Sequence, residues 1–454
     1  MKNYFKKEII VGKCIDLSSE GKGIIKDKDK IIFVNGLFID EEAEVELLYM
    51  RAGIYYGKIK RLIKKSPHRI EPKCKVCSSC GGCQFQQLEY NSQLIFKKDK
   101  VKEALLRIGH IDFKVNDCLG MENPYNYRNK IQVPFGYDKY RKIIYGFYKE
   151  NTHKIINIDT CNIEDKRSSL ILKNIKELMP KYNLHPYNED KLSGELRHVL
   201  IRTSFYRKEV MVVLVMTIED FKGRNNFVKE LINKCSDITT IILNINKRKT
   251  DVILGEKEKV LYGSGFILDK LCDISFRISP KSFYQINPTQ CEKLYRTAIN
   301  LASLNKNDVV LDAYCGIGTI GLVASNYVKK VLGVEVVSDA VIDAKNNARA
   351  NKTNNAFFIN EDASKYMLDL ASKKEHIDVV FVDPPRKGSD EVFLNSLNTL
   401  LPSKIVYISC NPATLARDLT FLLKNYEIKE VQPVDMFPFT YHVETVVLLS
   451  RKNG

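Results

Sequence analysis

The chain has 454 residues, more than one hydrophobic core normally organises, so two to four domains are expected. Its 71 basic and 55 acidic residues give a formal net charge of +16, and the clustering of this charge favours a polyanionic partner. The sequence contains no apolar run of membrane-spanning length, and the N-terminus continues into charge, so we expect a cytoplasmic protein with no membrane association. Twelve cysteines in such a protein indicate thiol chemistry or metal ligation rather than disulfides.

Residues 8–64 alternate apolar and polar positions. The alternation breaks at four points that contain glycine: Gly12, Gly21-Lys22-Gly23, Asn35-Gly36 and Gly53. Short strands with such turns predict a small closed barrel. The last stretch of the predicted barrel, residues 58–65, begins a basic run that continues to Lys75. A barrel with a basic stripe favours contact with single-stranded RNA over a merely solvated face. The segment resembles a TRAM domain, an OB-like RNA-binding module.

Four cysteines then fall within ten residues, at Cys74, Cys77, Cys80 and Cys83. A zinc ribbon separates its two cysteine pairs by a longer stretch, so a zinc site formed by this run alone would be strained. Close thiolate spacing with glycines favours an iron–sulfur cluster, because small residues let backbone N–H groups reach the sulfides. Cys161 is a candidate for a further ligand from elsewhere in the chain.

Residues 91–108 predict an amphipathic helix that Asn91 or Ser92 would cap and Gly109 would end. Its apolar face consists of Leu94, Val101, Leu105 and Ile108, and its other face carries Lys97, Lys98, Lys100 and Lys102. From there to about residue 273 the chain predicts mostly strands. Tyrosines interleave with basic residues at 125–130 and 137–148, either as half-buried sheet residues or as stacking partners for RNA bases.

From Ser279 onward, strands and helices alternate, which predicts a doubly wound sheet. Asn287 would cap a helix that has Pro288 at its first position. The expected strands are 309–313, 331–334, 356–359, 377–382 and 404–409, with a last one at 443–449.

A glycine-rich turn, Tyr314-Cys315-Gly316-Ile317-Gly318-Thr319-Ile320-Gly321, follows the first of these strands. Gly316 would permit the tight turn, Gly318 the approach of a ligand, and Gly321 close packing of the next helix. Glu335, at the end of the next strand, is placed to accept both hydroxyls of a ribose. The pattern predicts a nucleoside-cofactor site, either for a dinucleotide or for S-adenosylmethionine.

Two further strand ends carry reactive groups. One strand delivers Asp383, followed by two prolines, which presents a carboxylate and backbone carbonyls to a planar base. The other ends at Cys410, directly before a helix that starts at Asn411-Pro412, so we expect the helix N-terminus to lower the pKa of this thiol. A nucleophile, a base-binding carboxylate and a methyl donor together fit methylation of uracil at C5, with Glu444 as the candidate base.

These residues also resemble a known family. The runs Ser409-Cys410-Asn411-Pro412, Leu415-Ala416-Arg417-Asp418, His442-Val443-Glu444-Thr445-Val446, Phe283-Tyr284-Gln285-Ile286-Asn287, Tyr314-Cys315-Gly316 and Asp383-Pro384-Pro385-Arg386 are similar to those of RNA (uracil-C5)-methyltransferases of the RumA/TrmA type. The resemblance implies Cys410 as nucleophile and Glu444 as the base that removes the C5 proton. It also implies residues around S-adenosylmethionine and the target uracil, namely Gln285, Tyr314, Thr319, Glu335, Asp362 and Asp383, with Asp362 on the adenine.

The TRAM-like start and the cysteine run resemble the ribosomal-RNA branch of this family, since the tRNA branch is expected to lack both. The spacing in that branch assigns Cys74, Cys80, Cys83 and the distant Cys161 to a [4Fe–4S] cluster and leaves Cys77 surplus.

The resulting expectation is an α/β protein with an OB-like barrel at 1–65, a central β-rich domain with the cluster at 66–90 and 110–275, and a class I Rossmann-like methyltransferase domain at 91–109 and 276–454. It would be a monomer that forms 5-methyluridine at an unpaired or opened loop of 23S ribosomal RNA. Three alternatives remain: the same chemistry on tRNA, an NAD-dependent oxidoreductase, and a non-enzymatic iron–sulfur protein that binds RNA.

Overall fold

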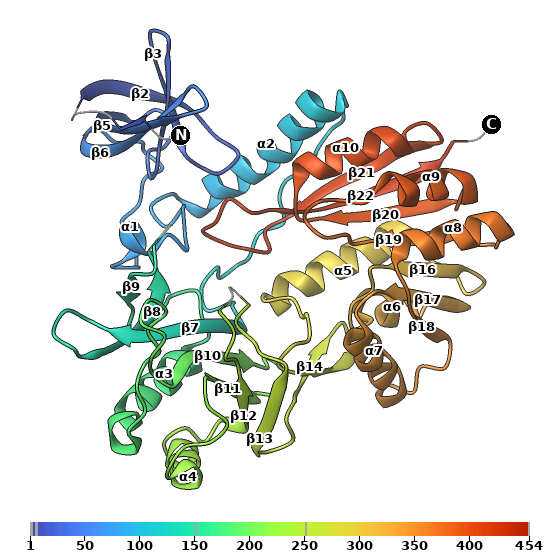
Figure 1. Ribbon diagram of the computed structural model, residues 1–454. Coiled ribbons are helices and arrows are strands. Elements are labelled where there is room, and N and C mark those ends of the chain that lie inside the picture. The colour runs from blue at the N-terminus through green and yellow to red at the C-terminus, as the bar shows by residue number, and fades with distance from the viewer. Residues whose placement is uncertain (1–2, 5–7, 150–151, 250–251, 453–454) are drawn as a thin grey trace.

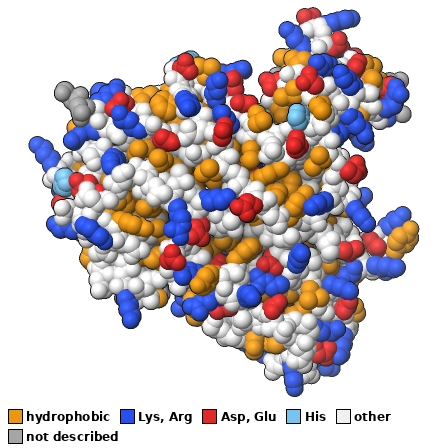
Figure 2. Space-filling model, turned by 180° about the vertical axis from the view of Figure 1, so that it is seen from behind, with side chains coloured by type: hydrophobic (Ala, Val, Ile, Leu, Met, Phe, Trp, Pro, Cys, Tyr) orange, Lys and Arg blue, Asp and Glu red, His pale blue; other side chains and the backbone are white. Residues whose placement is uncertain are grey.

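The computed structural model describes residues 3–4, 8–149, 152–249 and 252–452. Three sheets organise it: a barrel near the N-terminus, a central sheet, and a C-terminal sheet between helices (Figure 1). The barrel protrudes from the rest as a separate lobe, which Figure 2 shows at the upper right.

The N-terminal lobe is a closed barrel of five strands. Its strands are β2 (Ile9–Leu17), β3 (Gly23–Asp27), β4 (Lys30–Val34), β5 (Glu42–Arg51) and β6 (Ile54–Lys64), with β1 (Asn3–Tyr4) added at the edge. Because β5 pairs with both β2 and β6, the order β5-β2-β3-β4-β6 closes on itself, as expected for an OB-like fold. The predicted break at Gly12 is wrong, because this residue lies inside β2. A Cβ atom there would come within 2.4 Å of the Ile25 side chain, so packing of the barrel core explains this glycine.

The central part contains a seven-stranded sheet with the order β13-β12-β11-β10-β7-β8-β9. Its strands are β7 (Lys130–Tyr137), β8 (Ile143–Tyr148), β9 (Ile155–Asn157), β10 (Leu196–Thr203), β11 (Val210–Met216), β12 (Ile238–Ile245) and β13 (Lys257–Tyr262). Helices α3 (Lys166–Leu178) and α4 (Arg224–Lys234), which the sequence analysis did not anticipate, bury apolar side chains in the core of this sheet. Tyr127 and Tyr145 are buried structural residues, whereas Tyr140 is exposed. Short elements complete this part: α1 (Cys77–Cys80), the 3-10 turn η1 (Pro180–Tyr182), β14 (Ile267–Leu271) and β15 (Ile274–Ile278).

The C-terminal sheet has the order β18-β17-β16-β19-β20-β22-β21. Its strands are β16 (Val309–Ala313), β17 (Lys330–Glu335), β18 (Ala356–Asn360), β19 (Val379–Val382), β20 (Lys404–Ser409), β21 (Tyr426–Val434) and β22 (Glu444–Arg451). Its helices are α5 (Pro288–Ala302), α6 (Thr319–Ala324), α7 (Ser338–Ala350), α8 (Ala363–Lys373), α9 (Glu391–Leu400) and α10 (Pro412–Leu422). Strands β16 to β20 are parallel, and β22 runs antiparallel to both β20 and β21. Asn287 caps α5 as predicted, because its side chain accepts a hydrogen bond from the Gln290 backbone.

Helix α2 (Tyr90–Gly109) lies early in the chain but packs against α10 of the C-terminal part (Figure 1). Val101 and Leu105 join the same apolar core as Leu415, whereas the predicted core residue Ile108 is 47% exposed. Glu89 precedes the helix without a side-chain cap, so the predicted caps are wrong. Within the described parts of the chain, no helix is both long and apolar enough to cross a membrane.

The lysines of α2 do not form a free basic face. The ammonium group of Lys97 is fully buried and pairs with the carboxylate of Asp435, while Lys98 pairs with Asp117 at 2.8 Å. Lys100 donates to the backbone carbonyl of Tyr441 at 2.9 Å. Lys97 and Lys100 therefore anchor α2 to residues that lie 338 and 341 positions further along the chain. Helical periodicity does not reveal partners at such distances in sequence.

Candidate active site at the carboxyl edge of the sheet

Strand pairing brings the predicted reactive residues together at one edge of the C-terminal sheet. Ser409 of β20 is paired with Thr445 of β22, so the next residues outward, Cys410 and Glu444, lie beside each other. In the same way, Val382 of β19 is paired with Ala313 of β16. The next residue, Asp383, therefore lies beside the start of the glycine-rich turn. The carboxyl edge of an open α/β sheet is where ligands bind, and the strand order reverses at β16 and β19.

The charged groups of this edge act on one another. Burial raises the pKa of Glu444 to about 8, with a further contribution from the nearby Asp383. Burial alone raises the pKa of Asp383 to about 7. Both carboxyl groups are therefore poised to exchange protons near neutral pH.

Cys410 differs from the expectation for a thiol at a helix N-terminus. Its pKa is raised to about 11, mainly by burial and also by the carboxyl groups of Glu444 and Asp383, against a smaller opposing effect of the Arg386 guanidinium. The predicted lowering is wrong because desolvation and two neighbouring acids outweigh the helix N-terminus. Formation of the thiolate thus depends on the protonation of the two acids and on Arg386.

The turn that carries Cys410 is fixed from both sides. Asn411 caps α10 through its side-chain oxygen, and its amide nitrogen donates to the Arg386 carbonyl at 3.1 Å. The buried Asp418 accepts from the Tyr407 hydroxyl at 2.5 Å and from the backbone of Ser389 at 2.8 Å. Asp418, to which the sequence analysis gave no role, thereby fastens the loop after Asp383 to the strand that ends at Cys410.

The glycine-rich turn has the predicted shape, but its glycines divide the roles differently. Gly316 has a φ of 54°, and a Cβ atom there would have no other atom within 4 Å, so ligand approach is open at this position. Gly318 has a φ of 81°, and its Cβ would lie 2.7 Å from the Phe358 ring, which makes it a packing requirement rather than a point of ligand approach. Gly321 packs against β16 as predicted, because a Cβ there would lie 2.9 Å from the Asp312 carboxylate.

Glu335 holds this turn through both carboxylate oxygens. One accepts from the backbone N–H of Gly316 at 3.1 Å and the other from that of Val337 at 2.8 Å. Each oxygen keeps a second lone pair for a ribose hydroxyl. The neighbouring Val336 is 65% exposed and offers an apolar surface for a nucleoside base, a contribution that the sequence analysis missed. The sequence signal for this contribution was the apolar pair Val336-Val337 directly after Glu335. The Glu335 carboxylate and the exposed Val336 side chain therefore fit a nucleoside such as that of S-adenosylmethionine.

The remaining predicted residues occupy the same edge or its support. Asp362 caps α8 with one oxygen, which accepts from the backbone of Ser364 and Lys365 at 3.0 and 3.1 Å. Tyr314, with a φ of 63°, stacks at an angle on Phe393. Thr319 shares a hydrogen bond of 3.0 Å with the Tyr295 hydroxyl. The backbone carbonyl of Gln285 accepts from Asn129 of the central part at 3.0 Å.

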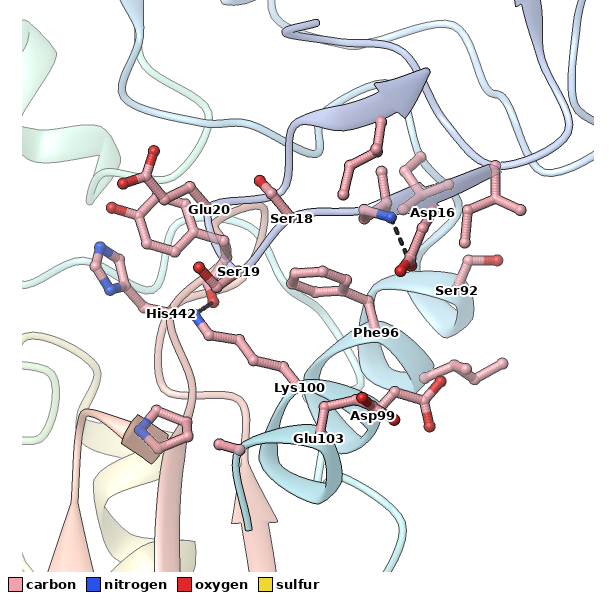
Figure 3. A pocket seen from close by; sticks show the side chains of 18 of the residues that line it. Asp16, Ser18, Ser19, Glu20, Ser92, Phe96, Asp99, Lys100, Glu103 and His442 are labelled. Carbon is pink, nitrogen blue, oxygen red and sulfur yellow. Dashed lines mark hydrogen bonds between the residues drawn. The ribbon is translucent and has the colours of Figure 1, made fainter. Parts of the chain in front are cut away.

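Cys410 opens onto a cavity of about 880 Å³ between the barrel, α2 and the loops that carry Arg386 and His442. Figure 3 shows Lys100 projecting from α2 toward the segment of His442, with Glu20 and Ser19 of the barrel beside it. Acidic side chains line much of the barrel and helix walls: Asp16, Glu20, Asp40, Asp99 and Glu103. On the face that Figure 2 shows, lysines and arginines are scattered among acidic residues.

The cysteine run lies between the barrel and the central sheet. Burial raises the pKa of Cys83 to about 12, and the thiols of Cys80 and Cys74 contribute, so these three groups are close to one another. Cys161 interacts in the same way with Cys83, and both side chains pack against the small apolar cluster of Tyr127, Ile163 and Phe439.

The arrangement of the cysteines must be compared with two kinds of site, one for a single metal ion and one for an iron–sulfur cluster. Among the described residues, no group of three or more His, Cys, Asp or Glu side chains is arranged around one metal-ion position. In a [4Fe–4S] cluster each thiolate binds a different iron, so its four sulfurs stand further apart than the ligands of one ion. The donor set of four neighbouring thiols fits such a cluster in chemistry.

The chain is similar to known RNA-modifying proteins over nearly its whole length. Residues 89–452 match the family described as tRNA (uracil-5-)-methyltransferase. An uncharacterized RNA methyltransferase of Clostridium tetani is 43% identical over 435 residues, which cover 96% of this chain and 94% of the relative. Another, from Staphylococcus aureus, is 41% identical over 448 residues, with 98% and 99% covered.

A solved structure is also similar, that of the Pyrococcus abyssi tRNA (uracil-54, C5)-methyltransferase in complex with S-adenosyl-L-homocysteine. It has a TM-score of 0.77 and 30% sequence identity, and it covers 97% of this chain and 99% of that chain. Coverage of this extent includes most of the N-terminal barrel. The expectation that tRNA-modifying members lack this region is therefore wrong for this neighbour.

Proposed function

The chain belongs to the tRNA (uracil-5-)-methyltransferase family, and on that premise we propose that it forms 5-methyluridine through a covalent bond between Cys410 and the target uracil. Membership makes it an RNA methyltransferase that uses S-adenosylmethionine, which decides against an NAD-dependent oxidoreductase. The observation that carries the proposal is the pairing of β20 with β22, which sets Cys410 beside Glu444 at the ligand-binding edge.

The proposed chemistry follows from the weakness of uracil C5 as a nucleophile. The Cys410 thiolate adds to C6 and forms a C–S bond, and the displaced electron pair gives an enolate. C5 of this enolate takes the methyl group from the sulfonium. The Glu444 carboxylate then removes the C5 proton, the C5–C6 double bond reforms, and the thiolate leaves. Asp383 lies near Glu444 and raises its pKa, so both forms of Glu444 are present near neutral pH and the ionised form accepts the C5 proton.

Two variants separate the roles of the nucleophile and the base. Cys410→Ala should abolish methyl transfer and every covalent complex with RNA, but should still bind S-adenosylmethionine. Glu444→Gln should add and methylate but fail to release, so that a methylated covalent adduct accumulates as a shifted band on a denaturing gel. Release of free product at the normal rate by Glu444→Gln would remove Glu444 as the base and make Asp383 the next residue to test.

For the substrate, we propose a uridine in an unpaired or opened loop of 23S ribosomal RNA. The resemblance of the cysteine run to the ribosomal branch supports this choice. Transfer RNA is the second candidate, favoured by the full-length similarity to the Pyrococcus abyssi tRNA enzyme. Mapping of 5-methyluridine in both RNAs from a strain that lacks the gene decides between them, because only the true substrate loses the modification.

We also propose that Cys74, Cys80, Cys83 and Cys161 hold a [4Fe–4S] cluster. The mutual influence of three of these thiols and the packing of Cys161 beside Cys83 support the assignment. Anaerobically purified protein should contain iron and sulfide. Cys161→Ser should lower the iron content strongly, whereas the matched change Cys77→Ser should lower it little. Equal losses would overturn the ligand set, and stoichiometric zinc in place of iron would overturn the cluster.

A further inference from the structure

Residues 435–443, here called the strap, connect β21 to β22 and end directly before Glu444. The strap is held mainly by elements from the first third of the chain, and the side chains of Asn287 and Gln290 also donate to its backbone. Lys97 of α2 pairs with Asp435 and donates to the Phe437 carbonyl at 3.0 Å, and Lys100 donates to the Tyr441 carbonyl at 2.9 Å. The base thus stands at the end of a segment whose position depends on remote parts of the molecule.

Phe439 lies at the centre of the strap and is bound through its backbone on both sides. Its N–H donates to the side-chain oxygen of Gln93 in α2 at 3.0 Å. Its carbonyl accepts from the N–H groups of Gln84 and Phe85 at 2.9 and 3.0 Å, and these residues directly follow Cys83. One residue of the strap therefore joins α2 and the cysteine run to the catalytic sheet.

The conformation of Phe439 shows that this arrangement is imposed by its surroundings. Its φ is 65°, in the left-handed region that a bulky side chain rarely adopts. Its ring is only 2% exposed and fills the small apolar cluster with Tyr127 and Ile163, against which Cys83 and Cys161 pack. Backbone strain of this kind persists only where the environment over-determines it, and it is concentrated at functional sites.

We propose that Phe439 is a positioning residue for the catalytic base: by holding the strap against α2 and the cysteine run, it sets where Glu444 stands relative to Cys410. The inference rests on the proposed function, because it gives Glu444 the role of base. Phe439 touches neither the uracil nor the methyl donor in this scheme and acts only through the strap.

The position of Glu444 can be read from Cys410 without RNA or cofactor. The groups that face Cys410 are Glu444 and Asp383, which raise its pKa, and Arg386, which lowers it. If truncation of Phe439 lets Glu444 withdraw, the thiol loses one acidic neighbour and should be alkylated at lower pH. The Glu444→Gln variant gives the reference for complete loss of that negative charge.

The experiment measures the rate of iodoacetamide labelling of Cys410 against pH by peptide mass spectrometry. It compares wild-type protein, Phe439→Ala, Glu444→Gln and the control Ile163→Ala. Ile163 belongs to the same apolar cluster but lies outside the strap, so its truncation loosens the cluster while the strap keeps all of its own side chains. Phe439→Ala should move the labelling midpoint in the same direction as Glu444→Gln, and Ile163→Ala should leave it at the wild-type value.

The second readout is the RNA adduct. Phe439→Ala should form the covalent adduct at a rate within about threefold of wild type but release product at least tenfold more slowly, with an RNA KM close to normal. Wild-type midpoint and release rate in Phe439→Ala, or equal shifts in both cluster variants, overturn the inference. Absence of uracil methylation by the wild-type enzyme would instead overturn the proposed function, which keeps the two failures distinguishable.

Discussion

Glu444 is a buried acid, and its burial has a measurable consequence for the stability of the protein. In the folded protein its pKa lies near 8, above the usual value of a glutamate, because burial penalises the charged form. The folded state therefore holds this proton more tightly than the unfolded chain does. Stability from this group is complete below the unfolded pKa and is lost as the pH rises toward 8.

Glu444→Gln should for this reason stabilise the protein in alkaline but not in acidic solution. Glutamine resembles the protonated acid, so the free energies of unfolding should agree near pH 4.5. Near pH 8.5 the variant should be more stable, by at most roughly 5 kcal/mol. Denaturant unfolding at both pH values measures the difference. The exposed Glu375→Gln serves as control and should show no such dependence. Equal effects of Glu444→Gln at both pH values would contradict the assigned pKa.

At the scale of elements, Gly316 and Gly318 make a matched pair. Both have positive φ, but a Cβ at Gly316 meets open space, while a Cβ at Gly318 lies 2.7 Å from the ring of Phe358. Gly318→Ala should cost about 2–3 kcal/mol through strain and overpacking, and Gly316→Ala about 1 kcal/mol through strain alone. The affinity for S-adenosylmethionine, measured by calorimetry, should show the opposite order: Gly316→Ala should lower it more than Gly318→Ala does. Gly316→Ala would then weaken binding out of proportion to its small effect on folding.

The sequence predicted the C-terminal elements well, because parallel strands are continuous apolar runs and the glycine-rich turn has a mechanism. Cys410 and Glu444 could be chosen because their neighbours match a family pattern. The ionisation of Cys410 could not be predicted, since the helix rule is local and the acids come from other strands. The burial of Lys97 escaped for the same reason, as its partner Asp435 is 338 residues away. Helices α3 and α4 were missed amid the strong strand signals on either side.

For the whole molecule, net charge predicts an RNA affinity that falls as the salt concentration rises. The structure indicates which basic residues of the run 58–75 are available to contact RNA phosphates. Arg69 in the basic run is committed to the buried Glu41, and Lys60 pairs with Glu46 at 3.2 Å. Lys64 and Lys65 are exposed at the end of β6. Changing both to alanine should lower the slope of log affinity against log salt by about 1.4, at about 0.7 for each contact with a single strand.

Filter binding at several salt concentrations measures this slope, and Lys60→Ala is the matched control that should change it little. An unchanged slope in the Lys64→Ala, Lys65→Ala double variant would move the main phosphate contacts to the central sheet. S-adenosylmethionine binding should remain at the wild-type level in each of these variants, since the barrel lies outside the cofactor edge (Figure 1).

The long span between α2 and the strap also bears on the order of synthesis. A chain leaves the ribosome from its N-terminus, and its early segments fold as they emerge. Lys97 then appears long before Asp435, and the face of α2 that packs on α10 has no partner until most of the protein has been made. Nascent chains that stall before residue 435 should therefore expose this helix to chaperones and proteases. Glu444, the proposed catalytic base, is therefore added only when translation is almost complete.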